Sequence, residues 1–240
     1  MKLSIVIPVF NEESTLEGLL RRVLKAKLPL KFKKEIIIVD DASTDGSYKL
    51  SQLFKKNNKR SEIKLIKHVK NQGKGASVVD GLRVSTGEIV IIQDADLEYN
   101  PDDYQKLIEP ILKMKTDIVY GTRLKNYPLK LFGKNKTPLV THYLGNKFLT
   151  LITEILYQQK VSDMETCYKV FRKKVLNNIQ IKARRFDFEP EFTAKILKSG
   201  YKIYEVPIRV KPRGYDEGKK ISWHDGFIAL WTLIKYRFID

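Results

Sequence analysis

The sequence predicts an α/β fold in which helices flank a mostly parallel central sheet. Its first half alternates short runs of β-branched residues with helical patterns, which is typical of parallel strands covered by helices on both faces. One apolar run, residues 88–93, stops at two carboxylates, Asp94 and Asp96, as expected where a buried strand reaches the edge of a sheet. In such folds ligands bind at the carboxyl ends of the strands, so these turns are the first place to look for a site.

The elements of the first half alternate along the chain without a break. Predicted strands cover residues 3–9, 35–40, 63–69, 88–93 and 117–121, and predicted helices cover residues 12–27, 46–56, 75–85 and 102–115.

The second half has a different pattern. A basic loop, residues 130–136, is followed by a long apolar and aromatic helix over 138–157, a helix over 189–198 and a strand over 202–210. The chain closes with apolar residues at helical spacing, which predicts an amphipathic C-terminal helix. These residues are Trp223, Phe227, Leu230, Trp231, Ile234 and Phe238.

Composition limits the class of protein. A chain of 240 residues with 42% hydrophobic content is long enough to bury a substantial core as one domain. Its single cysteine, Cys167, excludes an internal disulfide, and with only three histidines a structural zinc site is not expected. No apolar stretch is long enough to span a bilayer. The sequence therefore favours a globular protein that needs neither disulfides nor zinc to fold.

The formal net charge of +17 implies attraction to polyanions, which include nucleic acid, acidic lipid surfaces and phosphorylated substrates. Charge alone does not choose among them. No nucleic-acid recognition motif accompanies the lysines, so we expect no nucleic-acid partner and keep a basic nucleic-acid-binding protein only as a remote alternative.

Three turns after predicted strands carry the chemistry. Asp94 and Asp96 project to one side of an extended segment, and their hard oxygen ligands suit Mg²⁺ or Mn²⁺ holding a diphosphate. The turn over residues 40–46 offers carboxylates for a base or ribose. The turn over residues 71–75 offers backbone amides and Lys74 for phosphate oxygens. Each turn alone could equally be a solvated strand end, so the prediction of a nucleotide site depends on all three turns occurring together.

In order and spacing, these segments resemble the family 2 glycosyltransferases of the GT-A fold. Within that family the chain is most similar to the dolichyl-phosphate or polyprenyl-phosphate mannose and glucose synthases. The resemblance covers nearly the whole chain, because three later segments also take part. The segments are residues 6–13, 40–43, 71–75, 94–96, 163–172, 188–191 and 205–208.

The resemblance implies an inverting, metal-dependent transfer of a hexose from a nucleotide sugar to a polyprenyl or dolichyl phosphate at a membrane surface. The donor is expected to be GDP-mannose, UDP-glucose or UDP-N-acetylglucosamine, with Mg²⁺ or Mn²⁺ as cofactor. One GT-A domain would span 1–240, with 1–125 binding the nucleotide sugar and 126–240 binding the acceptor and the membrane interface. We expect a cytoplasmic protein held peripherally at the cytoplasmic face of a membrane, with room for a membrane-anchoring partner.

The resemblance also assigns site residues. Four are expected to act in catalysis: Asp96, Arg123, Arg213 and Lys219. The residues expected to bind the nucleotide sugar are Pro8, Phe10, Asn11, Glu12, Val39, Asp41, Gly73, Lys74, Asp94, Ala95, Asp96, Arg123, Arg213 and Lys219. The metal ligands would be Asp94, Asp96 and Glu98, and the acceptor phosphate would meet Arg123, Lys136 and His142.

Two positions depart from the family pattern. Glu98 stands where the mannose synthases commonly have a glutamine that reaches the metal, and no second arginine for the acceptor phosphate stands in residues 130–143. The acceptor therefore stays open, with a glycan or other soluble acceptor as the alternative. An ionised phosphate needs no base, whereas a hydroxyl acceptor would, with Asp163 or Glu165 as the candidates. The helices over 138–157 and 223–238 either pack on the sheet or lie in the membrane interface.

Overall fold

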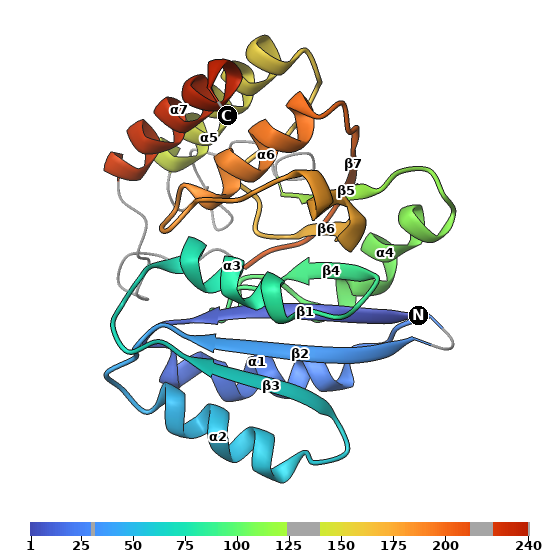
Figure 1. Ribbon diagram of the computed structural model, residues 1–240, viewed down its shortest axis with the longest axis vertical. Coiled ribbons are helices and arrows are strands. Elements are labelled where there is room, and N and C mark those ends of the chain that lie inside the picture. The colour runs from blue at the N-terminus through green and yellow to red at the C-terminus, as the bar shows by residue number, and fades with distance from the viewer. Residues whose placement is uncertain (30–31, 124–139, 212–222, 240) are drawn as a thin grey trace, which may run out of the picture.

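A seven-stranded sheet forms the centre of the computed structural model, which describes residues 1–29, 32–123, 140–211 and 223–239 (Figure 1). Its strands are β1 Lys2–Val9, β2 Lys33–Asp40, β3 Glu62–Lys67, β4 Ile89–Ile92, β5 Ile118–Thr122, β6 Lys169–Arg172 and β7 Ile203–Pro207.

The sheet is mostly parallel, as the sequence predicts. Its strand order is β3-β2-β1-β4-β6-β5-β7, and only β6 runs antiparallel to its two neighbours. Strand β6 was not predicted from the sequence, because a four-residue strand that begins with Lys169 and ends with Arg172 lacks an apolar run long enough to stand out. Since β6 is reversed, it begins at the edge where the other strands end. The loop that precedes it therefore lies at that edge.

Helices cover both faces of the sheet. The α-helices are α1 Glu13–Lys25, α2 Ser47–Asn57, α3 Lys74–Val84, α4 Tyr104–Leu112, α5 Val140–Tyr157, α6 Phe188–Lys198 and α7 Trp223–Phe238, and two 3₁₀ turns are η1 Pro101–Asp103 and η2 Lys173–Asn178. In Figure 1, α3 lies in front of the sheet and α1 behind it, on the opposite face, as right-handed crossovers require. Helices α5, α6 and α7 gather at the upper end of the molecule.

Strand register brings the turns to one level. Val9 pairs with Asp40 and Val6 with Ile92, so the segments that follow β1, β2 and β4 emerge side by side. The strands themselves are almost wholly buried, and β4 is apolar throughout because both of its faces are covered. This rigid apolar core fixes the positions at which the polar turns begin.

The predicted helices are all present, with ends that differ by a few residues. The strand expected over 202–210 ends at Pro207, beyond which Val210 forms an isolated bridge with Tyr99. In the part of the chain that the structure describes, no helix is both long enough and apolar enough to cross a membrane.

Candidate active site

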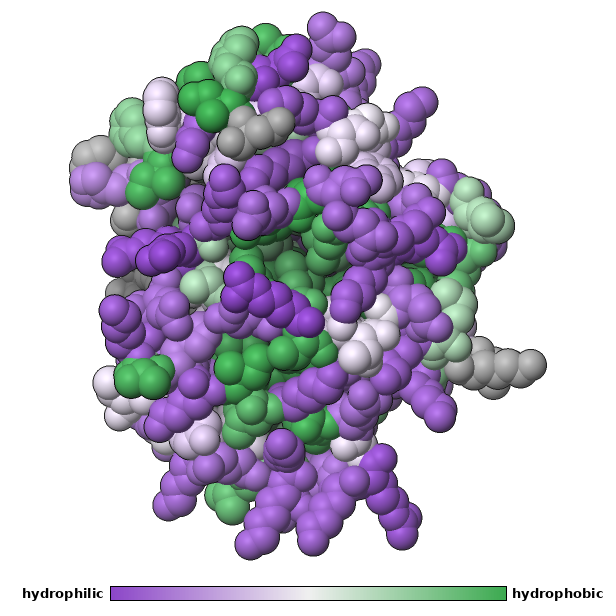
Figure 2. All heavy atoms as spheres, viewed as in Figure 1, coloured by the Kyte–Doolittle hydropathy of each residue, from purple (hydrophilic) through white to green (hydrophobic). Residues whose placement is uncertain are grey.

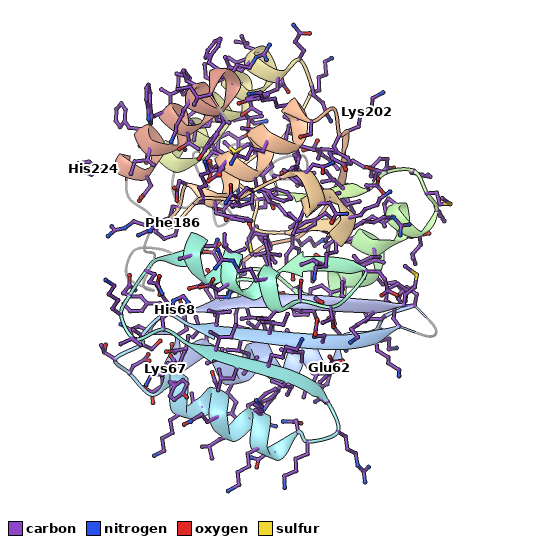
Figure 3. All side chains as sticks on the ribbon, in the orientation of Figure 1. Glu62, Lys67, His68, Phe186, Lys202 and His224 are labelled. Carbon is purple, nitrogen blue, oxygen red and sulfur yellow. The ribbon has the colours of Figure 1, made fainter. Side chains whose placement is uncertain are left out.

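The candidate site lies along the edge where β1 to β5 end and β6 begins. Figure 3 shows the direction of the sheet: Lys67 and His68 lie at the left-hand end of β3 and Glu62 at its right-hand end, so the left edge is the carboxyl edge. Phe186, in the segment before α6, lies at the same edge. Segments from both halves of the chain therefore meet there.

The turns after β1 and β2 are fastened to each other. The amide of Asn11 donates to Ser43 Oγ at 3.0 Å, and Asn11 Oδ1 accepts from the Thr44 amide at 2.8 Å. The Glu12 amide donates to Ser47 Oγ at 2.8 Å. These cross-turn bonds give the surface predicted to hold the nucleoside a fixed shape before any ligand arrives.

Left-handed backbone conformations follow each of the first four strands. They occur at Asn11 (φ 51°), Ala42 (φ 59°), Gly73 (φ 97°) and Leu97 (φ 61°). Such conformations are costly for alanine and leucine, and they persist only where the surroundings enforce them. Strain of this kind clusters at functional sites, which agrees with the placement of the site at this edge.

Asp41 supports the 71–75 loop from inside the protein. Its carboxylate accepts hydrogen bonds from the amides of Gln72 at 2.8 Å and Gly73 at 2.7 Å. His68 Nδ1 lies 2.7 Å from Asp41 Oδ1, and its Nε2 lies 3.2 Å from Asp80. The predicted role of Asp41 in holding the nucleoside stays a prediction. In this structure, its carboxylate holds the loop that carries Lys74.

Three amides of the 71–75 loop are bound within the protein, and the expectation that this loop binds phosphate stays a prediction. Besides the amides bound to Asp41, those of Gly75 and Ala76 donate to the carbonyls of Arg185 and Arg184 at 3.0 and 2.9 Å. The glycines serve close packing: a Cβ on Gly73 would lie 2.4 Å from the Arg184 carbonyl oxygen. The loop is therefore held in shape by its own amides and presents the side chain of Lys74 at the edge of the sheet.

Lys74 bridges the partly buried carboxylate of Asp94 and the buried carboxylate of Glu189. Its Nζ lies 2.9 Å from Asp94 Oδ1 and 2.8 Å from Glu189 Oε1, at the first turn of α6. Burial disfavours the ammonium, but the two carboxylates outweigh it and raise the pKa of Lys74 well above its ordinary value. Burial likewise opposes ionisation of Asp94, yet Lys74 holds the pKa of Asp94 below its usual range. The pair is charged at neutral pH.

The carboxylates after β4 fit a divalent cation that arrives with a diphosphate. Among the residues that the structure describes, no three acidic, histidine or cysteine side chains gather as a ready metal site, so Asp94, Asp96 and Glu98 do not form one in advance. Asp96 Oδ1 accepts the Glu98 amide at 3.1 Å, which fixes the turn. Mg²⁺ commonly takes only one or two protein carboxylates and completes its shell with phosphate oxygens and water. Asp94 and Asp96 are suitable for that role.

Arg123 follows β5 and is locked in place. Its Nε and Nη2 each donate to Asp163 at 2.7 Å, and its amide adds a third bond at 2.9 Å. Asn146 of α5 donates to the same carboxylate at 3.1 Å. Burial works against ionisation of Asp163, but Arg123 outweighs it and lowers the pKa of that carboxyl. The guanidinium is thereby oriented at the edge of the sheet, between the two halves of the chain.

The remaining predicted residues divide into two groups. Pro8, Phe10, Val39 and Ala95 lie at the ends of β1, β2 and β4, with Val39 and Ala95 buried, so these two contribute shape rather than polar contacts. Lys136, Arg213 and Lys219 lie outside the described residues, as does the side chain of His142. Their assignments stay predictions.

Two residues at the site were not assigned roles from the sequence. Glu189 pairs with Lys74, and His68 links Asp41 to Asp80. Both partnerships join segments far apart in the chain, so spacing alone gives no signal for them. For Glu189, the available indications are its place in the 188–191 segment that takes part in the family resemblance and its position in the first turn of a predicted helix.

Comparison with known proteins agrees with this geometry. The Glycosyl transferase family 2 profile matches residues 4–180. The UDP-N-acetylglucosamine–dolichyl-phosphate N-acetylglucosaminyltransferase of Methanococcus voltae is 28% identical, covering 96% of this chain and 94% of that protein. The dolichol-phosphate mannosyltransferase of Pyrococcus furiosus is 29% identical, covering 91% of this chain and 59% of that protein.

A solved structure shows the same fold. The glucosyl-3-phosphoglycerate synthase of Mycobacterium tuberculosis, in complex with Mn²⁺, UDP and glucosyl-3-phosphoglycerate, matches with a TM-score of 0.72 at 18% identity, over all of this chain and 81% of that one. This likeness shows that the sheet, with Lys74 and its carboxylates at the carboxyl edge, has the GT-A fold. The chain belongs to the family 2 glycosyltransferases.

Proposed function

We propose that this enzyme transfers a hexose from a nucleotide sugar to a polyprenyl or dolichyl phosphate at a membrane surface. The observation that carries the proposal is the Lys74–Asp94 pair at the end of β4, which sets a cation and a carboxylate where a diphosphate and its metal would lie. The two relatives named as dolichyl-phosphate transferases support the acceptor class. The donor is GDP-mannose, UDP-glucose or UDP-N-acetylglucosamine.

In this scheme the protein supplies charge at fixed positions. Asp94 and Asp96 would hold Mg²⁺ or Mn²⁺, which supplies Lewis-acid stabilisation of the diphosphate leaving group when bound. Lys74 places a positive charge beside that group, and Arg213 and Lys219 are proposed to add to it. Arg123, already oriented by Asp163, is proposed to receive the acceptor phosphate. Charges fixed in advance lower the barrier because nothing must reorganise when the bond breaks.

The state of Asp163 favours a phosphate acceptor. Both of its oxygens accept bonds from Arg123 or Asn146, and its pKa is lowered, so it is a poor base for a hydroxyl. An ionised phosphate needs no proton removed. The arrangement around Asp163 thus serves to hold Arg123 rather than to accept a proton.

The membrane part of the proposal rests on helices α5 and α7, which pack against each other. Exposed apolar side chains, here called the apolar strip, line both helices; they are Leu144, Phe148, Leu151 and Ile155 on α5, and Phe227, Ile228, Trp231 and Phe238 on α7. Figure 2 shows hydrophobic surface at the upper left, where these helices lie. Phe148 is 52% exposed and Trp231 63%. Large exposed apolar rows of this kind mark interaction sites.

Basic residues accompany the apolar strip. Lys147 on α5 and Lys235 and Arg237 on α7 lie on the same two helices, and the whole chain carries a net charge of +17. Apolar and cationic side chains together suit an interface with anionic lipid. An enzyme seated there would have its Arg123 edge close to lipid phosphates.

A transfer assay tests the proposed function. Purified protein is incubated with each labelled nucleotide sugar, Mn²⁺ and dolichyl phosphate in detergent, and the organic phase is counted. We expect one donor to give a labelled lipid, and Asp94→Asn to reduce the rate by about 100-fold or more, as loss of a group stabilising transition-state charge does. Label transferred only to a soluble glycan, with none in the lipid phase, would contradict the proposed acceptor.

A further inference from the structure

Glu165 is a partly buried residue at the carboxyl edge of the sheet, and one of its carboxylate oxygens has no hydrogen-bond partner. It lies in the loop between Asp163 and β6, at the carboxyl edge of the sheet. Its Oε1 is buried and makes no hydrogen bond, whereas Asp163, Asp94 and Glu189 are each held by a cation. A buried polar oxygen left unpaired costs free energy, so its retention calls for an explanation in terms of a ligand.

The surroundings of Glu165 locate that ligand. Glu165 follows Asp163, which binds Arg123, and precedes Cys167, whose Sγ lies 3.7 Å from the carbonyl oxygen of Ile92 at the end of β4. Its loop therefore runs between the Arg123 end of the site and the Lys74 end. In the proposed function, the diphosphate lies at Lys74 and the acceptor phosphate at Arg123. The transferred sugar lies between the two phosphates, and Glu165 is the carboxyl on that path.

The charges around Glu165 decide what kind of group it can bind. Burial, and then the charge of Glu189, raise the pKa of Glu165 to about 7, so an additional anion such as phosphate is disfavoured there. The charge of Lys169 offsets this rise in pKa only in part, and its ammonium is directed elsewhere: it donates to the carbonyls of Met164 at 2.9 Å and Thr166 at 2.6 Å and lies 4.4 Å from the Tyr120 ring centroid. A neutral hydroxyl that donates a hydrogen bond fits this site.

We propose that Glu165 binds a hydroxyl of the transferred sugar and so contributes to the choice of donor. The inference rests on the proposed function, because it needs a sugar between the two phosphates. A site built to accept a hydrogen bond from a substrate hydroxyl discriminates against analogues that lack it, since the buried acceptor is then left unpaired. Glu165 is therefore a specificity-determining residue rather than part of the metal site.

Titration calorimetry separates this role from the alternatives. The proteins are the wild type, Glu165→Ala, Glu165→Gln and the control Glu109→Gln, which changes an exposed carboxylate on α4 that pairs with Lys113. The probes are GDP and UDP, then GDP-mannose, UDP-glucose and UDP-N-acetylglucosamine, each with Mn²⁺. We expect Glu165→Ala to bind the free diphosphate within about 2-fold of the wild type but to lose about 5- to 10-fold in affinity for the matching sugar conjugate, the worth of one hydrogen bond.

Deoxy analogues of that conjugate identify the hydroxyl. The analogue that lacks the bound hydroxyl should lose affinity for the wild type and none for Glu165→Ala, because the missing group then has no partner. Equal losses for diphosphate and conjugate, or no loss for either, would overturn the inference while leaving the proposed function in place. If Glu165→Gln bound the sugar conjugate as the wild type does but lost transfer to hydroxyl acceptors only, Glu165 would instead act as a base, and the inference would be wrong. No binding of any nucleotide by the folded wild type would refute the proposed function itself.

Discussion

At the scale of single residues, the site is organised by buried and partly buried charges in fixed pairs. Lys74 is held between Asp94 and Glu189, and Arg123 is held by Asp163. Each pair is desolvated, so its stability depends on good geometry rather than on solvent. Glu165 differs because one of its oxygens has no partner, and this difference has a measurable consequence for stability.

The raised pKa of Glu165 should make the wild type lose stability as the pH rises. Its folded pKa of about 7 lies above the ordinary 4.5, so between these values the unfolded chain gives up a proton that the folded protein keeps. The resulting loss of folding stability is absent below pH 4.5, grows between pH 4.5 and about 7, and is complete above about pH 7. For a shift of this size it reaches at most about 3 kcal/mol.

Replacing Glu165 with glutamine removes that dependence. We expect Glu165→Gln to gain stability relative to the wild type as the pH rises. The difference in the free energy of unfolding, variant minus wild type, should be about 1–3 kcal/mol larger at pH 8 than at pH 5. Urea unfolding at the two pH values measures it. Glu109→Gln, which alters an exposed carboxylate, should show no such gain. The same relative stability at both pH values would mean that Glu165 is solvated.

At the scale of elements, the loop between β3 and α3 shows how the fold sets the position of Lys74. Gly73 has a left-handed backbone conformation and lies close to the Arg184 carbonyl, and its amide donates a hydrogen bond to Asp41. Any side chain at this position must push the loop away from the segment before α6. Since Lys74 is the next residue, such a shift would also break its contacts with Asp94 and Glu189.

The chain offers a matched pair of glycines to test this. Gly73 and Gly200 both have positive φ, but a Cβ on Gly200 meets nothing within 4 Å. Gly200→Ala should therefore cost only the backbone strain, about 1 kcal/mol, whereas Gly73→Ala should cost about 2–4 kcal/mol because a clash is added. Thermal or urea unfolding gives both values. Equal losses of stability in the two variants would show that the close approach to Arg184 adds nothing to the cost of a side chain at Gly73.

The elements of the first half were predictable because their signals are local. Apolar runs such as residues 89–92 identify strands, and the acidic turn at Asp94 marks where one of them ends. What could not be predicted depends on contacts between distant segments. Strand β6 is too short and polar to stand out, and the closure of the 71–75 amides by Asp41 and the 184–185 carbonyls depends on tertiary packing. Hence the assignment of Lys74 to phosphate stays a prediction, and its partner Glu189 was not foreseen.

At the scale of the whole molecule, the two ends have different tasks. The strands β1 to β4 and their turns form the end proposed to bind the nucleotide, and α5, α6 and α7 gather at the other (Figure 1). Asn146 of α5 contacts Asp163, so the helix that bears half of the apolar strip also supports Arg123. Seating of the apolar strip in a membrane would thus place the acceptor end of the site at the lipid surface.

Charge introduced into the apolar strip should prevent membrane binding. We expect the double variant Phe148→Glu and Trp231→Glu to lower co-sedimentation with vesicles containing anionic lipid by about 10-fold or more, because two exposed aromatic side chains proposed to insert into the membrane are replaced by carboxylates that anionic lipid repels. Met114→Glu is the control, since Met114 is exposed outside this surface. Unchanged sedimentation of the double variant would remove the apolar strip from the membrane proposal, and equal loss in the control would reduce the effect to net charge.

The central claim is that the edge of the sheet around Lys74 and Asp94 binds a nucleotide diphosphate with a divalent metal. Thermal unfolding of the wild type and of Asp94→Asn, with GDP or UDP and with or without Mn²⁺, tests it most directly, because a ligand that binds the folded state raises its melting temperature. We predict a rise with one nucleotide that requires Mn²⁺ and is lost in Asp94→Asn. A folded wild type that gains no stability from either nucleotide with Mn²⁺, or an equal gain in the variant, would contradict the claim.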